Sequence, residues 1–295
     1  MARVLVIGLA TMDFVFQVET LPEEARKYRA RAAEAVSGGC AANAAVAITR
    51  LGGEALLGTW LGFDHLGELI VSDLQREGVD TKHVQRTGGA NSSFSSVYVD
   101  SAGERQIMNF READPVVENA WIADVTGVDT VLCDTRWNQG AVAALKLARK
   151  TGVPGIVDAE APVTAGTLEF ASHVAFSRQG LLSLVHDADL PAALNKAAEK
   201  LGVWVCVTDG DKGVWYSGPN GIEHVAAYTV DAKDTLAAGD VWHGAFALAL
   251  GEGRDESGAV RFANATAAIK CSRTGGRNGA PSRVEVEDFL KERTR

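Results

Sequence analysis

From Val128 onward, short apolar segments that are typical of strands alternate with longer segments that are typical of helices. The expected strands cover residues 130–133, 155–157, 173–176 and 203–207, and the expected helices cover 139–150, 164–171, 179–186 and 190–201. Such alternation favours right-handed βαβ units, in which helices cover one parallel sheet. The apolar run at residues 4–7 predicts a further strand that is buried on both faces. The predicted fold class is therefore α/β with a mostly parallel sheet.

Four short segments lie outside this alternation. Residues 14–20 and 28–36 have mixed polarity and show no helical stripe. Residues 93–99 and 105–110 alternate in polarity around a polar turn, which indicates a hairpin. We expect these segments to form a second, smaller sheet outside the main layer.

Charge and cysteine content exclude several kinds of partner. The formal net charge is -9, from 29 Lys plus Arg against 38 Asp plus Glu, so we expect neither nucleic acid nor an anionic membrane as a partner. Cys40, Cys133, Cys206 and Cys271 lie too far apart in sequence for a zinc knuckle or a Cys-x-x-Cys redox site. No segment has the character of a signal peptide or the length of a membrane span. We expect a cytoplasmic protein.

Two segments open helices in a way that suits a bound anion. Residues 234–240, Asp-Thr-Leu-Ala-Ala-Gly-Asp, lead into an apolar helix. The free backbone N–H groups at the N-terminus of this helix and the Asp240 carboxylate would therefore lie together. Taken alone, an ordinary capped core helix explains this segment better. Gly38 and Gly39 precede an Ala-rich helix that carries Asn43, and glycines allow a ligand to approach the backbone closely. No Walker A motif is present, so any phosphate site is not a P-loop.

Four stretches, taken in order, resemble the ribokinase (PfkB) carbohydrate kinase family. They are the glycine pair with Asn43, Gly-Phe-Asp-His-Leu-Gly at 62–67, Val-Thr-Asp-Gly at 207–210, and the segment 234–240. The resemblance runs over essentially the whole chain, and both family signatures stand at the expected ends.

The resemblance implies a fold, a phosphoryl donor and an oligomeric state. The fold is a ribokinase-like three-layer α/β/α domain over residues 1–295, with a small β-sheet lid formed by about residues 12–36 and 91–112. The donor is ATP, with Mg²⁺ as cofactor. A homodimer formed through the lid is also implied, and it would cover the exposed edges and the apolar face of a small sheet.

The resemblance also assigns roles to individual residues. Asp240 matches the catalytic base, and the N–H groups of Ala237, Ala238, Gly239 and Asp240 match an anion hole for the transferring phosphoryl group. Asp13, Gly38, Gly39 and Asn43 match family positions that contact the sugar. Thr208, Gly210 and Gly213 match positions that contact the nucleotide phosphates, and Asn264 lies where the family packs the adenine.

The sequence departs from the family pattern at two places. Ala237 stands where the family usually has Gly, and its methyl group is tolerable if its φ is negative. The usual Asn-x-x-Glu, which helps to organise Mg²⁺, appears as Ser-Arg-Gln-Gly at 177–180, so the metal ligands stay unknown. Whether K⁺ binds near the loop at 273–281 is left open.

Within the family, several stretches resemble the sulfofructose kinase branch of sulfoquinovose breakdown. They are residues 21–28, Asn109, and Asp-Thr-Arg-Trp at 134–137, together with residues 241–244 and 270–277. If Lys27, Asn109 and Arg136 converge, they form a receptor for an anionic group on the acceptor. The expected reaction is transfer of the ATP γ-phosphate to the primary hydroxyl of 6-deoxy-6-sulfofructose, which gives its 1-phosphate.

Three alternatives remain at this stage. The first is a kinase for a neutral or carboxylated sugar, such as fructose, ribose or 2-keto-3-deoxygluconate, with Lys27 and Arg136 on the surface. Nucleosides are disfavoured because the lid lacks an obvious aromatic cluster for stacking a base. A non-catalytic sugar sensor would explain Ala237 and the lost Glu, but such a sensor has no need of Asp240.

Overall fold

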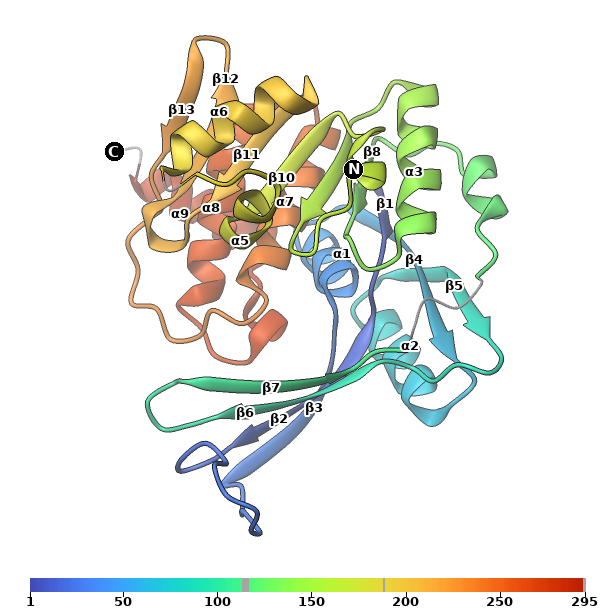
Figure 1. The fold of residues 1–295 in the computed structure, drawn as a ribbon, viewed down its shortest axis with the longest axis vertical. Helices are drawn as coiled ribbons and strands as arrows, with labels where there is room; N and C mark the ends of the chain where they lie inside the picture. The colour runs from blue at the N-terminus through green and yellow to red at the C-terminus, as the bar shows by residue number, and fades with distance from the viewer. Residues whose placement is uncertain (113–116, 188, 294–295) are drawn as a thin grey trace.

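The computed structural model describes residues 1–112, 117–187 and 189–293, which form a large sheet with helices on both faces and a small sheet beside it (Figure 1). Across the described residues the large sheet has nine strands, in the order β13-β12-β11-β10-β9-β8-β1-β4-β5. Its parallel strands are β1 (Arg3–Ile7), β4 (Glu54–Gly62), β5 (Asp80–Thr87), β8 (Thr130–Cys133), β9 (Gly155–Ala159), β10 (His173–Ser177) and β11 (Trp204–Thr208). An antiparallel hairpin of β12 (Val214–Gly218) and β13 (Gly221–Val225) ends the sheet. The predicted α/β class is confirmed.

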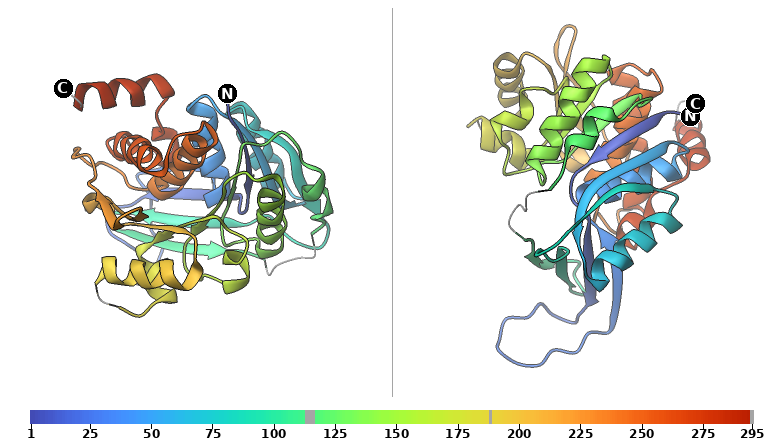
Figure 2. Two further views of the ribbon diagram at one scale, coloured as in Figure 1. Left: turned by 90° about the horizontal axis from the view of Figure 1, so that it is seen from above. Right: turned by 90° about the vertical axis from the view of Figure 1, so that its right-hand side faces the viewer.

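Helices form the outer two layers of the three-layer domain (Figure 2). One face of the sheet packs against α1 (Cys40–Arg50), α2 (His65–Arg76), α7 (Ala238–Gly251) and α8 (Glu256–Cys271), with α9 (Arg283–Arg293) outside α8. The other face packs against α3 (Asn138–Thr151), α4 (Ala165–Leu168), α5 (Arg178–Leu184) and α6 (Leu190–Leu201). Short 3-10 turns are η1 (Ala120–Asp124), η2 (Gly210–Lys212) and η3 (Gly276–Gly279).

Strand β1 shows why its residues form the centre of this core. Val4 and Val6 pack on the α1 and α7 side, whereas Leu5 and Ile7 pack on the α3 side, and all four are fully buried. Because side chains alternate across a strand, a continuous apolar run serves both faces at once. Each such side chain contributes roughly 1.5–3 kcal/mol through burial.

Two elements differ from the expectation. Strand β5 was not expected, since its sequence Asp-Thr-Lys-His-Val-Gln-Arg-Thr is largely polar; it is stabilised as an edge strand by its pairing with β4. The helix expected at 164–171 is reduced to the four residues of α4, in a segment that contains Gly166. Glycine is a poor helix former, so a longer helix is not favoured here.

The small sheet is confirmed as a separate layer. It contains β2 (Thr11–Gln17), β3 (Ala32–Gly38), β6 (Phe94–Val99) and β7 (Arg105–Phe110), in the order β3-β2-β6-β7. Strands β2 and β6 pair in parallel, and the outer pairs are antiparallel. In Figure 1 this sheet lies below the carboxyl ends of the large-sheet strands.

The strand order reverses at β1, which lies between β4 and β8. Ligands of open α/β sheets bind in the crevice that such a reversal leaves at the carboxyl ends of the strands. Here the buried Asp134, which follows β8, accepts hydrogen bonds from the N–H groups of Leu9 (2.7 Å), Ala41 (3.2 Å) and Arg136 (2.8 Å). This carboxylate ties the end of β1 to the start of α1. Among the described residues, no helix is long and apolar enough to cross a membrane.

Candidate active site

Two cavities meet at the N-terminus of α7. The first, of about 580 Å³, lies between the small sheet and the large domain and is lined by Ala237 and Asp240. The second, of about 570 Å³, is lined by Ala238 and Gly239. Consecutive residues of one turn therefore face two different cavities. We call the first the acceptor cavity and the second the nucleotide cavity.

The first turn of α7 presents backbone N–H groups between these cavities. The N–H groups of Gly239 and Asp240 begin the helix, where intrahelical acceptors are lacking, and the helix dipole favours an anion there. The N–H of Ala238 instead donates to the carbonyl of Thr235 at 3.2 Å. The predicted anion hole therefore needs one correction, because the Ala238 N–H is already used in the turn.

Ala237 has a backbone that favours glycine. Its φ is 62° and its ψ is 12°, which is left-handed, and among the described residues it is the one non-glycine with positive φ. The condition stated for tolerance, a negative φ, is not met. An L-residue pays roughly 1–2 kcal/mol for this conformation. The turn before α7 is therefore strained in this chain.

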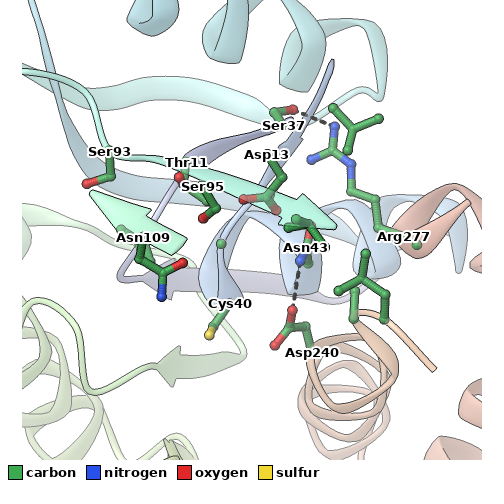
Figure 3. Close-up of a pocket in the computed structure, with 18 of the residues that line it drawn as sticks. Thr11, Asp13, Ser37, Cys40, Asn43, Ser93, Ser95, Asn109, Asp240 and Arg277 are labelled. Carbon is green, nitrogen blue, oxygen red and sulfur yellow. Dashed lines mark hydrogen bonds between the residues drawn. The ribbon is translucent and has the colours of Figure 1, made fainter. Parts of the chain in front are cut away.

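Asp240 lies at the floor of the acceptor cavity opposite α1 (Figure 3). The side-chain amide of Asn43 donates a hydrogen bond of 2.7 Å to Asp240 Oδ2. Burial of the carboxylate and the nearby charge of Asp158 raise the pKa of Asp240 to about 7, although the bond from Asn43 works in the opposite direction. A carboxylate with a pKa near neutrality is a suitable general base.

Further acidic groups surround Asp240. One ligand atom each of Cys40, Asp158 and Asp240 lies within 4.8 Å of the others, and Cys40 Sγ lies 3.8 Å from Glu160 Oε2. Burial, together with the charges of Glu160 and Asp134, raises the pKa of Asp158 well above its ordinary value. Sequence reasoning missed Asp158 and Glu160. The available signal was a pair of acids at the carboxyl end of an expected parallel strand.

The acceptor cavity contains most of the residues expected to contact a sugar. Gly38, Gly39 and Asn43 line it from β3 and α1, and Asp13 lines it from β2 (Figure 3). Burial raises the pKa of Asp13, while a hydrogen bond with Ser95 and the charge of Arg277 oppose this shift. A Cβ atom at Gly38 would lie 2.0 Å from Asp13 Oδ2, so only glycine leaves room for that carboxylate.

Two of the three residues expected to bind an anionic group lie in this cavity. Asn109 from β7 and Arg136 both line it. Arg136 is held by the Ala161 carbonyl (3.0 Å) and by the Glu160 carboxylate. The third, Lys27, is exposed in the irregular segment between β2 and β3 and does not line the cavity. The expected convergence of all three residues is therefore wrong for a single chain.

Arg277 is a cavity residue that sequence reasoning missed. The segment 273–281 was expected to be a loop, but it contains η3, and Arg277 is buried and lines the acceptor cavity. Its guanidinium donates to Ser37 Oγ at 2.6 Å (Figure 3). It also donates to the Asp73 carboxylate. An arginine in a Gly-rich segment carries no sequence signal of burial, because its partners come from β3 and α2.

The nucleotide cavity contains all four residues expected to contact ATP. Thr208, Gly210, Gly213 and Asn264 line it together with Trp242. Gly213 has a φ of 100°, and a Cβ atom there would lie 2.2 Å from the Val225 carbonyl oxygen. The oxygen of Asn264 accepts from the Trp242 indole N–H at 2.8 Å. Asn264 therefore fixes the wall of this cavity.

Aromatic side chains of the small sheet face away from the acceptor cavity. Phe14, Phe16, Phe94 and Tyr98 alternate along β2 and β6 with the cavity-lining residues. Phe16 and Tyr98 stack at 5.6 Å, and Phe14 meets Phe94 edge-on at 6.4 Å. The small sheet thus does contain an aromatic cluster, contrary to expectation. It lies on the face opposite the cavity, where Phe14 and Phe94 pack against the core of the large domain.

The two cavities share one helix N-terminus, beside a carboxylate. This arrangement suits in-line transfer of a phosphoryl group to a hydroxyl. Together with the fold, it defines a kinase of the α/β class. Over residues 1–283 the chain matches the family model described as pfkB family carbohydrate kinase, and it belongs to this family. It is thus a carbohydrate kinase, and the family uses ATP.

Individual relatives agree with this assignment. The chain is 28% identical over 297 residues to the ribokinase of Bacillus subtilis (strain 168), covering 98% of this chain and 100% of that protein. It resembles the crystal structure of a candidate ribokinase from Agrobacterium tumefaciens, with a TM-score of 0.92, 33% identity and coverage of 100% and 99%. The fold also matches Arabidopsis thaliana ribokinase complexed with ribose and ATP, with a TM-score of 0.86, 24% identity and coverage of 99% of both chains.

The raised pKa of Asp240 predicts the pH dependence of the reaction. A general base acts only when ionised, so kcat/KM should rise with pH through a midpoint of about 7 and fall about tenfold per unit well below it. Asp240→Asn should lower kcat by roughly 10²–10⁴-fold, while the exposed control Asp288→Asn should not. If kcat/KM stays flat over about one pH unit on either side of neutrality, this role is contradicted.

The same shift has a consequence for stability. Because the pKa of Asp240 is raised in the folded protein, the folded state binds the proton more tightly than the unfolded state does. Ionisation of Asp240 therefore costs stability as the pH rises from the unfolded pKa through about 7. Asp240→Asn should melt at a higher temperature than wild type at pH 8, and the difference should shrink at pH 5.

The strain at Ala237 predicts opposite effects for two neighbouring substitutions. Ala237→Gly removes the left-handed strain and should raise the free energy of unfolding by about 1 kcal/mol. Ala238→Gly lies within α7 without positive φ and should lower it by about 0.5–1 kcal/mol. Urea titrations of the two variants measure the difference, and equal destabilisation would show that Ala237 is not strained.

Proposed function

We propose that this kinase transfers the γ-phosphoryl group of ATP to the primary hydroxyl of an anionic ketose, 6-deoxy-6-sulfofructose, and forms its 1-phosphate. The observation that carries the proposal is that Arg136 and Asp240 line the same cavity, which the α7 N-terminus separates from the nucleotide cavity. A base and a cation are thus available to one acceptor molecule. The sulfonate would be recognised through charge-assisted hydrogen bonds from the guanidinium.

The residues of the α7 turn account for the transfer step. Asp240 takes the proton of the acceptor hydroxyl, whose oxygen forms the new bond to the γ-phosphorus as the bond to the β,γ-bridging oxygen breaks. The N–H groups of Gly239 and Asp240 face the negative charge on the transferred group, and ADP leaves with the bridging oxygen. Such preorganised donors supply most of what phosphoryl transfer requires.

The acceptor would be oriented by polar groups from both sheets. Asp13 accepts from sugar hydroxyls on the β2 side, and Asn43 keeps Asp240 aligned through its bond of 2.7 Å. Asn109 from β7 would donate its amide to the anionic end of the sugar beside Arg136. Arg111 and Arg277 also line this cavity and add positive charge.

A neutral sugar such as ribose or fructose is the second candidate acceptor. The observation that favours it is the ion pair between Arg136 and Glu160, which already occupies part of the guanidinium. A sulfonate must share Arg136 with that carboxylate, whereas a neutral hydroxyl group meets no such competition. The two candidates differ in one measurable property, the dependence of KM on the charge of Arg136.

Mg²⁺ would be held by carboxylates near the end of β9. The segment 177–180, which replaces the usual metal motif, is used otherwise: Ser177 caps α5, and Arg178 pairs with Asp209 at 2.8 Å. Asp158 and Glu160 offer oxygen ligands, and their mutual repulsion suits a cation, whereas the Cys40 thiol is a poor ligand for it. When bound, Mg²⁺ neutralises charge on the phosphates.

Glu160→Gln should raise the Mg²⁺ concentration needed for half-maximal rate, and an unchanged requirement would refute this assignment.

Lys270 would supply the positive charge at the loop 273–281 in place of K⁺. Its ammonium is fully buried, donates to the Asp234 carbonyl at 2.6 Å and lies 3.4 Å from Asp234 Oδ2. Burial lowers the pKa of Lys270, and the charge of Asp234 opposes that shift. A buried ammonium with these two partners leaves no need for an added cation at this carbonyl.

A homodimer would form through the outer face of the small sheet. Met108 is 73% exposed on β7, an edge strand, and the half-buried Phe16 and Tyr98 lie on the same face of the sheet. Apolar side chains gathered on one exposed sheet face indicate a contact with another protein surface.

The acceptor proposal is tested by kinetics with a panel of sugars. Sulfofructose should give the highest kcat/KM among sulfofructose, fructose, ribose, fructose-6-phosphate and 2-keto-3-deoxygluconate. Arg136→Ala should raise KM for sulfofructose by about 10–100-fold, as expected for losing a charged partner of an anion, and leave KM for fructose nearly unchanged. The exposed Arg149→Ala on α3 is the matched control. A preference for another sugar, or equal effects of Arg136→Ala on both, would contradict the proposal.

The role of Lys270 predicts how the rate responds to salts. Wild type should have the same kcat in K⁺, Na⁺ and tetramethylammonium chloride at equal ionic strength. Lys270→Met keeps the apolar stem but removes the ammonium, so its rate should fall and be partly restored by K⁺ alone. Activation of wild type by K⁺ would show that Lys270 does not replace this cation.

The dimer is tested by light scattering coupled to gel filtration. Wild type should elute with twice the mass of the chain, and Met108→Lys should shift it to the monomer because a charge is placed on the buried face. Leu69→Lys, on exposed α2, is the matched control and should remain dimeric. A monomeric wild type would remove this proposal.

A further inference from the structure

Arg105 links the small sheet to the catalytic turn of the large domain. It is the first residue of β7, next to the tip of the β6–β7 hairpin, which lies beneath the loop that leads into α7 (Figure 1). Its guanidinium donates a hydrogen bond of 3.0 Å to Asp234 Oδ1, across 129 residues of sequence. Asp234 opens the segment 234–240 that ends in the catalytic base.

Arg105 projects from the same face of β7 as two residues of the acceptor cavity. Side chains alternate along a strand, so Arg105, Ile107 and Asn109 share one face, and Ile107 and Asn109 line the cavity. If the β6–β7 hairpin shifted away from the large domain, the Arg105–Asp234 contact would break and the acceptor cavity would open at the same time. The position of this hairpin therefore determines both the contact and the opening of the cavity.

Asp234 organises the turn that leads into the anion hole. Its Oδ1 also accepts from the Leu236 N–H at 2.8 Å, its Oδ2 accepts from the Gly276 N–H at 2.7 Å, and the backbone N–H groups of Lys233 and Asp234 donate to the Cys271 carbonyl. Burial would raise the pKa of Asp234, but these bonds and the charges of Lys270 and Arg105 hold it below its usual range. Asp234 is thus ionised and fixed from several sides.

Arg105 is separable from this network. Its side chain is 28% exposed, and Asp234 keeps its bonds to Leu236, Gly276 and Lys270 when Arg105 is removed. The loss of Arg105 should therefore leave the large domain folded. What it removes is the ionic contact between the β6–β7 hairpin, which forms part of the cavity wall, and the turn.

We propose that Arg105 is a positioning residue that latches the β6–β7 hairpin over the acceptor cavity and couples its closure to the turn that forms the anion hole. Closure then excludes water from the γ-phosphoryl group while Arg105 contacts Asp234 in the turn that leads into α7. Loss of the latch leaves the transfer site accessible to water as well as to sugar. The proposal rests on phosphoryl transfer at α7 but not on which sugar is the acceptor.

Amide hydrogen exchange of the ligand-free protein tests the latch without any substrate. Arg105→Ala should speed exchange in residues 94–110 by about tenfold, the factor that corresponds to losing one partly exposed charged hydrogen bond, and leave exchange in α7 and α8 unchanged. The exchange rate of this segment in Arg105→Lys should be closer to that of wild type. Arg31→Ala, which removes the small-sheet ion pair with Glu19, is the matched control and should not alter this segment.

Kinetics then test the coupling, with sulfofructose and fructose as acceptors. Arg105→Ala should raise KM for each acceptor about tenfold and lower kcat, leave KM for ATP unchanged, and increase ATP hydrolysis relative to sugar phosphorylation. With the neutral acceptor fructose, KM of wild type should rise with added NaCl, whereas that of Arg105→Ala should not. Unchanged exchange and an unchanged hydrolysis ratio would overturn the latch, even if the melting temperature fell. Faster exchange with no activity on either sugar would fault the acceptor proposal instead.

Discussion

The close packing of α1 against α7 is the constraint on which the site depends. A Cβ atom at Gly244 would lie 2.5 Å from the Ala44 carbonyl oxygen, so the two helices approach this closely only because Gly244 has no side chain. That approach brings Asn43 within 2.7 Å of Asp240, although 197 residues separate them in the chain. Asp240, the N–H groups of the α7 turn and the start of α1 are therefore held in one rigid unit.

The small sheet completes this rigid unit with groups that come from other parts of the chain. Asp13, Ser95 and Asn109 close the acceptor cavity from β2, β6 and β7, while the nucleotide cavity needs none of them. The two cavities thus have different walls that meet at α7. The small sheet contacts the large domain through Arg105 and through the wall of the acceptor cavity.

Much of the fold was predictable because its signals are local. Continuous apolar runs identify the inner strands, and Gly and Asp at helix starts identify the turns, so the parallel sheet and the α7 turn follow from sequence. Polar β5 was missed because an edge strand is specified by its neighbour β4 rather than by its own pattern. Asp158, Glu160 and Arg277 were missed for a similar reason: they contact partners that only the tertiary structure brings near. Lys27 shows the reverse error, since a charge assigned to the cavity by resemblance lies outside it in a single chain.

The account rests most heavily on Asp240 as the base between two occupied cavities. A crystal structure with a non-hydrolysable ATP analogue and sulfofructose tests this most directly. It should show the acceptor's primary hydroxyl about 3 Å from an Asp240 carboxylate oxygen and in line with the γ-phosphoryl group at the N–H groups of Gly239 and Asp240. A γ-phosphoryl group that points away from α7, or an acceptor whose hydroxyl does not reach Asp240, would contradict it.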